Sequence, residues 1–210
     1  MNWWIAIRMT IVMTVLTGIA YPLAITGIGN LLFPYQAQGS LIVRNGRVAG
    51  SELIGQNFAA PKYFHGRPSA AGDAGYDADS SGGSNLAPTN RKLIEMVRQR
   101  VKNIMEQNPH DKAVQVPVDM VTASGSGLDP EITPAAASLQ APEVAKARGL
   151  SETAVRALVR RHTRPRWAGV LGEPGVNVLE LNLALDNLTA TNPSGMNQNR
   201  ATLSDPPVTR

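Results

Sequence analysis

The sequence predicts an α+β protein with a single N-terminal transmembrane helix, followed by one mixed extracytoplasmic domain with about three helices and a small sheet. Residues 9–32 form an uncharged, mostly apolar stretch. Later segments place apolar residues at helical spacing, whereas others alternate or flank a turn signal. The chain has 210 residues and no cysteine, which excludes disulfides and cysteine metal sites.

The apolar stretch is long enough to cross a bilayer. At about 1.5 Å per residue, residues 9–32 reach about 36 Å, and a hydrocarbon core is about 30 Å thick. A cleaved secretory signal is the alternative, but Tyr35 lies two positions before the small residue Ala37, which fits a cleavage site poorly. We therefore expect a retained anchor.

The charges around this stretch predict its orientation. Arg8 directly precedes it, and the next basic residue is Arg44. The positive-inside tendency then places the N-terminus in the cytoplasm and the bulk in the periplasm, with the chain in a bacterial inner (plasma) membrane. The predicted parts are a cytoplasmic N-terminus (1–8), a transmembrane helix (9–32), a soluble α+β domain (33–188) and a disordered polar tail (189–210).

The transmembrane stretch carries a strip of small residues. Thr10, Thr14 and Gly18 recur at every fourth position, and Pro22 is expected to kink the helix. Such strips let another helix approach closely in lipid. The alternative is that a lone anchor merely tolerates these residues. Because the soluble part shows no self-sufficient chemistry, we favour a subunit of a membrane complex.

The first half of the soluble part begins with a hairpin and continues in a long loop. Asn45-Gly46 between two β-like segments predicts a hairpin over 40–51. Residues 61–88 are rich in Gly, Pro, Ser and Asp, and loops of this length are usually functional or disordered. Apolar residues at helical spacing then predict a helix from Asn90 to the Asn108-Pro109 stop.

The second half predicts a strand, a loop and two helices. Residues 114–121 have β character, and another polar loop covers 122–130. Thr133 is expected to cap a helix that Pro142 breaks or restarts, with its second piece ending at Gly149. A further helix is expected from Ser151 to about Thr163.

The clearest predicted strand is Val176–Asp186. Leu179, Leu181, Leu183 and Leu185 alternate with more polar or smaller residues. Strict alternation is typical of a half-buried strand.

Charge and motif content exclude several classes of protein. The net charge is only +4. The sequence also lacks the interleaved basic and aromatic residues that would indicate nucleic-acid binding. The arginine cluster between residues 156 and 166 either touches lipid headgroups or an acidic partner, or is a solvated helix face. The chain lacks a phosphate-binding loop and a P-type phosphorylation motif.

No metal site or tightly bound cofactor is expected. The three histidines are far apart, without ligand or triad spacing. Residues 77–88 imitate the opening of a calcium loop, but Pro88 stands where a glutamate is needed. Asp119 and Asp129 are the carboxylates that an acid–base enzyme would use, although nothing in the sequence pairs them.

Two polar loops contain the candidate functional residues. The Ser81-Gly-Gly-Ser-Asn85 segment, just before a predicted helix, offers backbone N–H groups and hydroxyls that can hold phosphate; the alternative is a cap after a glycine turn. The other candidates in the two loops are Tyr63, His65, Arg67, Thr122, Ser124, Ser126 and Asp129.

Six motifs in order along the chain resemble those of the C subunit of the Kdp potassium-transporting P-type ATPase. They are Gly55-Gln-Asn-Phe58, Tyr63-Phe-His-Gly-Arg-Pro-Ser-Ala70, Ser81-Gly-Gly-Ser-Asn-Leu86, Val116-Pro-Val-Asp119, Thr122-Ala-Ser-Gly-Ser-Gly-Leu-Asp-Pro130 and Val176-Asn-Val-Leu-Glu-Leu-Asn182. The likeness runs from the membrane span to about Leu188. One departure is Glu143, where the family pattern leads us to expect an arginine.

The resemblance implies a subunit without catalysis of its own. Its implied partners are a potassium-channel-like subunit, a P-type ATPase subunit and a small membrane subunit. It also implies a catalytic chaperone that raises the ATP affinity of the ATPase subunit, with ATP bound only in a transient complex. Ser81, Gly82, Gly83, Ser84 and Asn85 are the nucleotide-contact candidates that it assigns.

The predicted orientation conflicts with direct contact to ATP. If Arg8 sets the topology, the soluble domain lies outside the cytoplasm, away from the ATPase head. Either the topology is reversed, or the domain caps the external entrance of the potassium pathway and acts indirectly by linkage. A stand-alone anchored binding or hydrolytic module that uses residues 122–130 is the alternative function.

Overall fold

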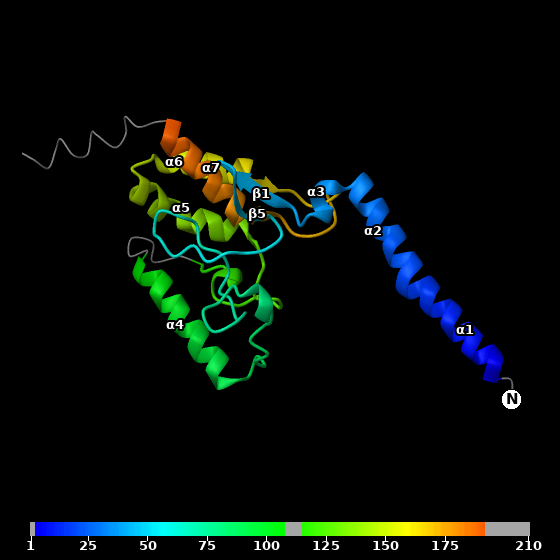
Figure 1. Cartoon of the computed structure of the whole chain (residues 1–210). Coiled ribbons are helices and arrows are strands. Elements are labelled where there is room, and N and C mark those ends of the chain that lie inside the picture. The colour runs from blue at the N-terminus through cyan, green and yellow to red at the C-terminus, as the bar shows by residue number, and fades with distance from the viewer. Residues whose placement is uncertain (1–2, 108–114, 192–210) are drawn as a thin grey trace, which may run out of the picture. The chain divides into compact units, whose positions relative to one another are not determined.

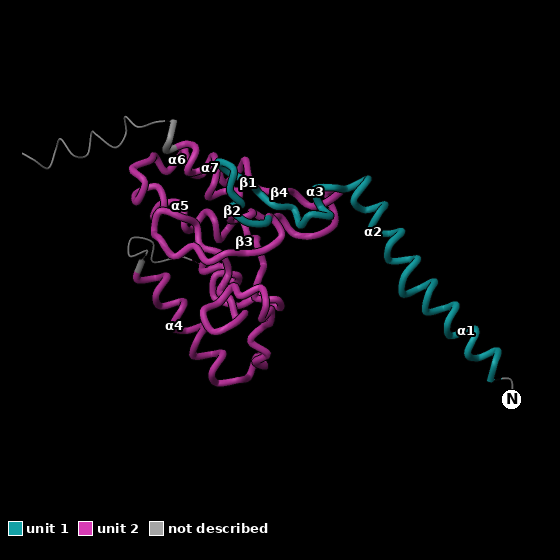
Figure 2. Tube along the Cα trace, viewed as in Figure 1, with its two compact units in different colours: residues 1–51 teal, residues 52–210 magenta. Residues whose placement is uncertain are grey.

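The computed structural model describes residues 3–107 and 115–191, which fall into two compact units. The first unit is Met1–Ser51 and the second is Glu52–Arg210 (Figure 2). The hairpin therefore belongs to the unit that carries the apolar helix. Most of the predicted disordered tail lies outside the described residues, and its first three residues form the end of a helix.

The first unit contains a continuous helical run, Trp3–Leu32 (Figure 1), that is long and apolar enough to cross a membrane by length and composition. It consists of α1 (Trp3–Val15), a π-helical turn (Leu16–Ala20) and α2 (Tyr21–Leu32). In the π turn the N–H of Tyr21 donates to the carbonyl of Leu16. Pro22 lacks an N–H and crowds the carbonyl four residues earlier, so the wider turn relieves the conflict at the predicted kink.

The predicted hairpin is confirmed. After the short helix α3 (Pro34–Ala37), β1 (Leu41–Arg44) pairs antiparallel with β2 (Arg47–Ser51). The turn residues Asn45 and Gly46 have φ values of 51° and 74°. Positive φ at both positions is what a two-residue hairpin turn needs, and Asn and Gly adopt it at low cost.

The second unit begins with a long irregular stretch and the helix α4 (Arg91–Gln107), which confirms the predicted helix. The Asn90 side chain accepts a 2.9 Å hydrogen bond from the N–H of Lys92 and so caps it. Arg100 donates a 2.8 Å hydrogen bond to the carbonyl of Val121 and ties α4 to the segment that follows. Among the described residues of the predicted 114–121 strand, Val118–Met120 form a 3₁₀ turn instead, because Pro117 cannot donate to a strand ladder.

The core of the second unit lies between three helices and a small antiparallel sheet. The sheet has the order β3 (Glu131–Ile132), β5 (Gly175–Asn177) and β4 (Thr163–Arg164). The helices α5 (Pro134–Arg148), α6 (Glu152–Arg161) and α7 (Val178–Thr191) lie beside it (Figure 1). The largest fully buried core side chains are Phe64, Val144, Val155, Val176, Leu181 and Leu185.

The caps of α5 are as predicted, but the break at Pro142 is not. The Thr133 hydroxyl accepts a 3.1 Å hydrogen bond from Ala136, and Gly149 ends the helix in a left-handed conformation. The helix continues through Pro142. Proline there costs one backbone hydrogen bond, and the buried neighbours Ala141 and Val144 hold the helix against the core.

The predicted strand over 176–186 is wrong, because most of this segment is α7. Only its first two residues belong to a strand. The Asn177 side chain accepts a 3.1 Å hydrogen bond from the N–H of Glu180 and starts the helix. Val178, Leu181, Asn182 and Leu185 are buried, and this spacing is helical. The buried polar Asn182 hides that period in a sequence whose leucines alternate.

Candidate functional site

Two side-chain amides hold the beginning of the first polar loop against the helices. Asn182 accepts a 2.8 Å hydrogen bond from the N–H of Phe64 and donates one of 2.9 Å to its carbonyl. Gln140 makes the same pair of bonds with His65, at 2.8 and 3.1 Å. These bonds replace a strand partner for a buried backbone, which would otherwise be unsatisfied.

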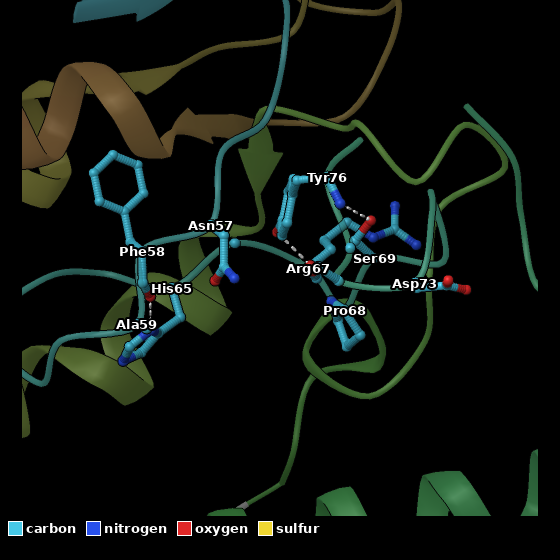
Figure 3. A pocket seen from close by; sticks show the side chains of 12 residues that line it. Asn57, Phe58, Ala59, His65, Arg67, Pro68, Ser69, Asp73 and Tyr76 are labelled. Carbon is cyan, nitrogen blue, oxygen red and sulfur yellow. Dashed lines mark hydrogen bonds between the residues drawn. The ribbon is translucent and has the colours of Figure 1, made fainter. Parts of the chain in front are cut away.

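The predicted site residues Tyr63 and His65 therefore lie beside the helical core. Tyr63 donates a 3.4 Å hydrogen bond to Asp186, which also forms a 2.9 Å ion pair with Arg148. The Arg148 guanidinium lies 4.9 Å from the centre of the Tyr63 ring. The His65 ring makes a short hydrogen bond to the carbonyl of Phe58 (Figure 3). Each side chain has a structural partner here.

Arg67 joins the two predicted loops. Its guanidinium forms a 3.0 Å ion pair with Asp129 and a 3.5 Å hydrogen bond with the carbonyl of Ala123. Among the residues that the structure describes, the Nε of Arg67 is a buried polar atom without a hydrogen-bond partner. The sequence did not show this pairing, because 62 residues separate Arg67 from Asp129.

Further hydrogen bonds, made by serine hydroxyls and backbone groups, join the two loops. The Ser69 hydroxyl donates a 2.7 Å hydrogen bond to the carbonyl of Gly127 and accepts one, also of 2.7 Å, from the N–H of Tyr76. The carbonyl of Ser126 accepts from the N–H of Gly82 at 2.8 Å and from the Ser81 hydroxyl at 3.1 Å. The structure thus brings residues 63–83 and 122–130 together into one crossed-loop site.

The nucleotide-contact candidates lie at the edge of this site. The N–H of Gly82 is bonded to the carbonyl of Ser126, and a Cβ added at Gly83 would lie 3.1 Å from the carbonyl oxygen of Gly125. Asn85 is exposed and has a positive φ of 50°. Residues 86–90 separate this segment from α4, which begins at Arg91, and phosphate binding by its backbone N–H groups and hydroxyls stays a prediction.

The hydroxyl and carboxylate candidates of the second loop stabilise its turns. Ser124 accepts a 2.9 Å hydrogen bond from the N–H of Gly127, and Ser126 accepts one of 3.1 Å from Leu128. Asp129 accepts a 3.0 Å hydrogen bond from the N–H of Glu131, and the Thr122 hydroxyl donates one of 2.7 Å to the carbonyl of Val118. Such local bonds are the ordinary use of these residues in turns.

The remaining predicted carboxylate, Asp119, is also engaged in the fold. Its side chain is 4% exposed and accepts 2.7 and 3.2 Å hydrogen bonds from the N–H and hydroxyl of Thr133. It does not lie in a pair with Asp129, which binds Arg67 instead. Glu143, where the family pattern favours arginine, is exposed on α5.

A cavity of about 410 Å³ opens beside the crossed loops. Among the side chains that line it, Figure 3 shows Asn57 and His65 to the left of Arg67, Ser69 and Tyr76. The Tyr76 hydroxyl donates a short hydrogen bond to the carbonyl of Arg67. At Gly66 an added Cβ would lie 2.5 Å from the Tyr76 hydroxyl oxygen, so this phenol packs directly against the loop backbone.

Tyr76 should titrate late. Burial raises the pKa of Tyr76 above its usual value of about 10, the charge of Asp129 adds to this, and Arg67 opposes it. The folded state therefore keeps the phenolic proton longer than the unfolded state. Its contribution to stability is complete below pH 10 and falls as the pH rises from there through the folded-state pKa.

An absorbance titration checks this expectation. Of the four tyrosines, Tyr76 should supply a late component of tyrosinate formation, and Tyr76→Phe should remove that component. Tyr63→Phe serves as the control, and should leave the late component in place. An unchanged titration curve in Tyr76→Phe would contradict the burial argument.

The strip of small residues on the apolar helix packs against no other segment in the described part of the chain. Thr10 and Thr14 are exposed, and a Cβ added at Gly18 would meet nothing within 4 Å. Gly18 lies inside the π-helical turn, so the regular four-residue spacing of the strip ends at this turn.

Comparison with known proteins gives a consistent result. The family model for KdpC, the K+-transporting ATPase c chain, matches residues 3–187. The chain is 58% identical over 191 residues to the potassium-transporting ATPase KdpC subunit of Gemmatimonas aurantiaca, covering 90% of this chain and 94% of that relative. It is 59% identical over 183 residues to the same subunit of Acidobacterium capsulatum, covering 87% and 96%. The chain therefore belongs to the KdpC family, the c chain of the K+-transporting ATPase.

Proposed function

We propose that the chain is a non-catalytic accessory subunit of an ATP-driven, high-affinity potassium uptake pump. It acts as an assembly factor and as a catalytic chaperone that raises the ATP affinity of the ATPase subunit. Its partners are the potassium-channel-like subunit, the P-type ATPase subunit and a small membrane subunit of the same complex. It resides in the bacterial inner membrane with its N-terminus in the cytoplasm.

One observation carries the non-catalytic role: the candidate groups of the crossed-loop site are bonded to one another or to backbone. Asp129 pairs with Arg67, and Ser126 and Ser124 accept bonds from the turns that contain them. A nucleophile or general base needs a partner that activates it and an open position for substrate. The bonds in this site support a rigid contact surface instead of a reacting centre.

The effect on ATP is then indirect. With the second unit outside the cytoplasm, the crossed-loop site favours one conformation of the transport subunits, and that conformation binds ATP more tightly. A coupling of this kind is typically about 1–3 kcal/mol, or about 5- to 150-fold in affinity. Direct contact through Ser81–Asn85 would require the reversed topology.

The test compares ATP binding to the purified pump with and without this subunit. We expect its removal to weaken ATP binding by about 5- to 150-fold, and the isolated full-length chain to bind no ATP and hydrolyse nothing. ATP binding by the isolated chain that Ser84→Ala abolishes would instead establish direct contact. Hydrolysis by the isolated chain that Ser126→Ala abolishes would favour the stand-alone module.

The orientation can be measured on the same protein. The chain has no cysteine, so that Ala87→Cys introduces a single thiol at an exposed position of the second unit. A membrane-impermeant maleimide should label this variant in intact spheroplasts. Labelling only after lysis would show the reversed topology.

Gly18→Leu should reduce the recovery of the partner subunits with the tagged chain. A Cβ added at Gly18 meets nothing within 4 Å in the described part of the chain, so we expect the loss to report contact with another helix. Ile19→Leu, in the same π-helical turn, is the matched control because it exchanges one large side chain for another. Equal recovery of the partner subunits by the two variants would show that Gly18 is not part of the assembly interface.

A further inference from the structure

The connection between β4 and β5 contains a narrow, ordered hairpin. Trp167 and Leu171 exchange backbone hydrogen bonds of 2.8 and 3.0 Å, and the N–H of Val170 donates 3.2 Å to the carbonyl of Trp167. Ala168 and Gly169 turn the chain with positive φ values of 48° and 78°. We call residues 166–172 the tip hairpin. Its own backbone bonds define its shape.

The tip hairpin exposes three large apolar side chains. Trp167 is 74% exposed, Val170 72% and Leu171 56%. Single exposed apolar residues are common on soluble surfaces, but turn tips usually carry Gly, Asn, Asp or Ser. Three such side chains gathered on one short turn indicate a surface that another phase or molecule covers.

The residues around the tip hairpin are basic. Residues 160–175 include four arginines and one glutamate. Arg164 pairs with Glu131 and Glu180, and Arg166 pairs with Glu173. Arg160 and Arg161, in the last turn of α6, are exposed and form no ion pair with the residues that the structure describes. Their charges are available to an anionic surface near the apolar tip.

This chemistry is that of a membrane interface. Tryptophan concentrates at the boundary between headgroups and acyl chains, and arginine places its aliphatic stem in that boundary while its charge meets the headgroups. The chain also carries its own candidate membrane span, Trp3–Leu32, which holds the second unit close to lipid. A tether of this kind lets a weak contact become well occupied.

We propose that the tip hairpin is a second, interfacial lipid contact of this chain. Trp167, Val170 and Leu171 insert at the headgroup–acyl boundary, and the nearby arginines lie against anionic headgroups. A protein partner is the less favoured occupant, because stable protein interfaces usually bury about 800 Å² on each side, which is more than three side chains on a narrow turn offer. The proposal is independent of any effect on ATP.

The experiment uses the full-length chain with one remaining tryptophan. The sequence has three tryptophans, so Trp3→Phe combined with Trp4→Phe leaves Trp167 alone. The variant is reconstituted into vesicles of phosphatidylcholine and phosphatidylglycerol, with or without bromine on the acyl chains. We expect a blue-shifted emission that brominated lipid quenches, and less quenching when phosphatidylglycerol is omitted.

Two controls make the result decisive. Val170→Ser with Leu171→Ser, in the same single-tryptophan chain, should shift the emission to the red and abolish quenching while the circular dichroism is unchanged. Emission that brominated lipid does not quench in the single-tryptophan chain would overturn the proposal. If that emission then shifts to the blue only when the other pump subunits are added, the tip hairpin is a protein contact instead.

Discussion

Asn182→Leu should destabilise the second unit by about 2–6 kcal/mol. The Asn182 amide satisfies both the N–H and the carbonyl of Phe64, and the two residues are almost fully buried. Leucine has a similar volume and no polar atom, so it leaves two buried backbone groups without partners. Each such group costs about 1–3 kcal/mol.

The measurement is urea-dependent proteolysis of the detergent-solubilised full-length chain. Asn103→Leu is the control, because Asn103 is exposed on α4 and its only described bond is to the side chain of Gln99. In Asn103→Leu the urea concentration at the midpoint of unfolding should change little. A midpoint of urea unfolding for Asn182→Leu close to that of Asn103→Leu would mean that water satisfies the Phe64 backbone, and that the Asn182 amide does not stabilise the fold.

Gly127→Ala should separate the crossed loops. Gly127 has a φ of +68°, and an added Cβ would lie 2.7 Å from both the N–H nitrogen of Ala71 and the carbonyl oxygen of Gly82. These are backbone atoms, which cannot swing aside as a flexible side chain can. The variant therefore carries the cost of a left-handed alanine, about 1–2 kcal/mol, and an overpacking cost of about 1–3 kcal/mol.

Gly149→Ala isolates the steric part of this cost. Gly149 has nearly the same φ, +64°, but an added Cβ meets nothing within 4 Å. We expect Gly127→Ala to be the less stable of the two in the same proteolysis assay. It should also recover less of the pump subunits from cells, because it disturbs the crossed-loop site. Equal stability of the two variants would show that residues 71, 82 and 127 move apart freely.

The parts of the fold that sequence predicts well depend on neighbouring residues. The Asn45-Gly46 turn, the Thr133 cap and the Gly149 stop each act within a few residues of their own position. The error at 176–186 arose from competing local patterns. Four alternating leucines indicate a strand, whereas Asn177 three residues before Glu180 is the signal of a helix start.

The candidate site was predicted as two separate loops and not as one surface. Polar, glycine-rich composition marks both segments, but it does not show that Arg67 meets Asp129 or that Gly82 meets Ser126. The side chains that hold the first loop, Gln140 and Asn182, lie on helices and resemble ordinary polar helix residues. Pairing across such distances depends on tertiary packing, which a local pattern does not encode.

The Asn182 amide and the Phe64 backbone that it holds are 118 residues apart in the chain. Because ribosomes deliver the chain from its N-terminus, residues 63–83 emerge well before their partner on α7 has been made. The bonds between Phe64 and Asn182 therefore form only near the end of synthesis, and we expect a chain truncated before α7 to leave the beginning of the first loop open to proteases. An unfinished chain therefore lacks the support that α7 gives to the crossed-loop site, by which we expect the pump to recognise the completed subunit.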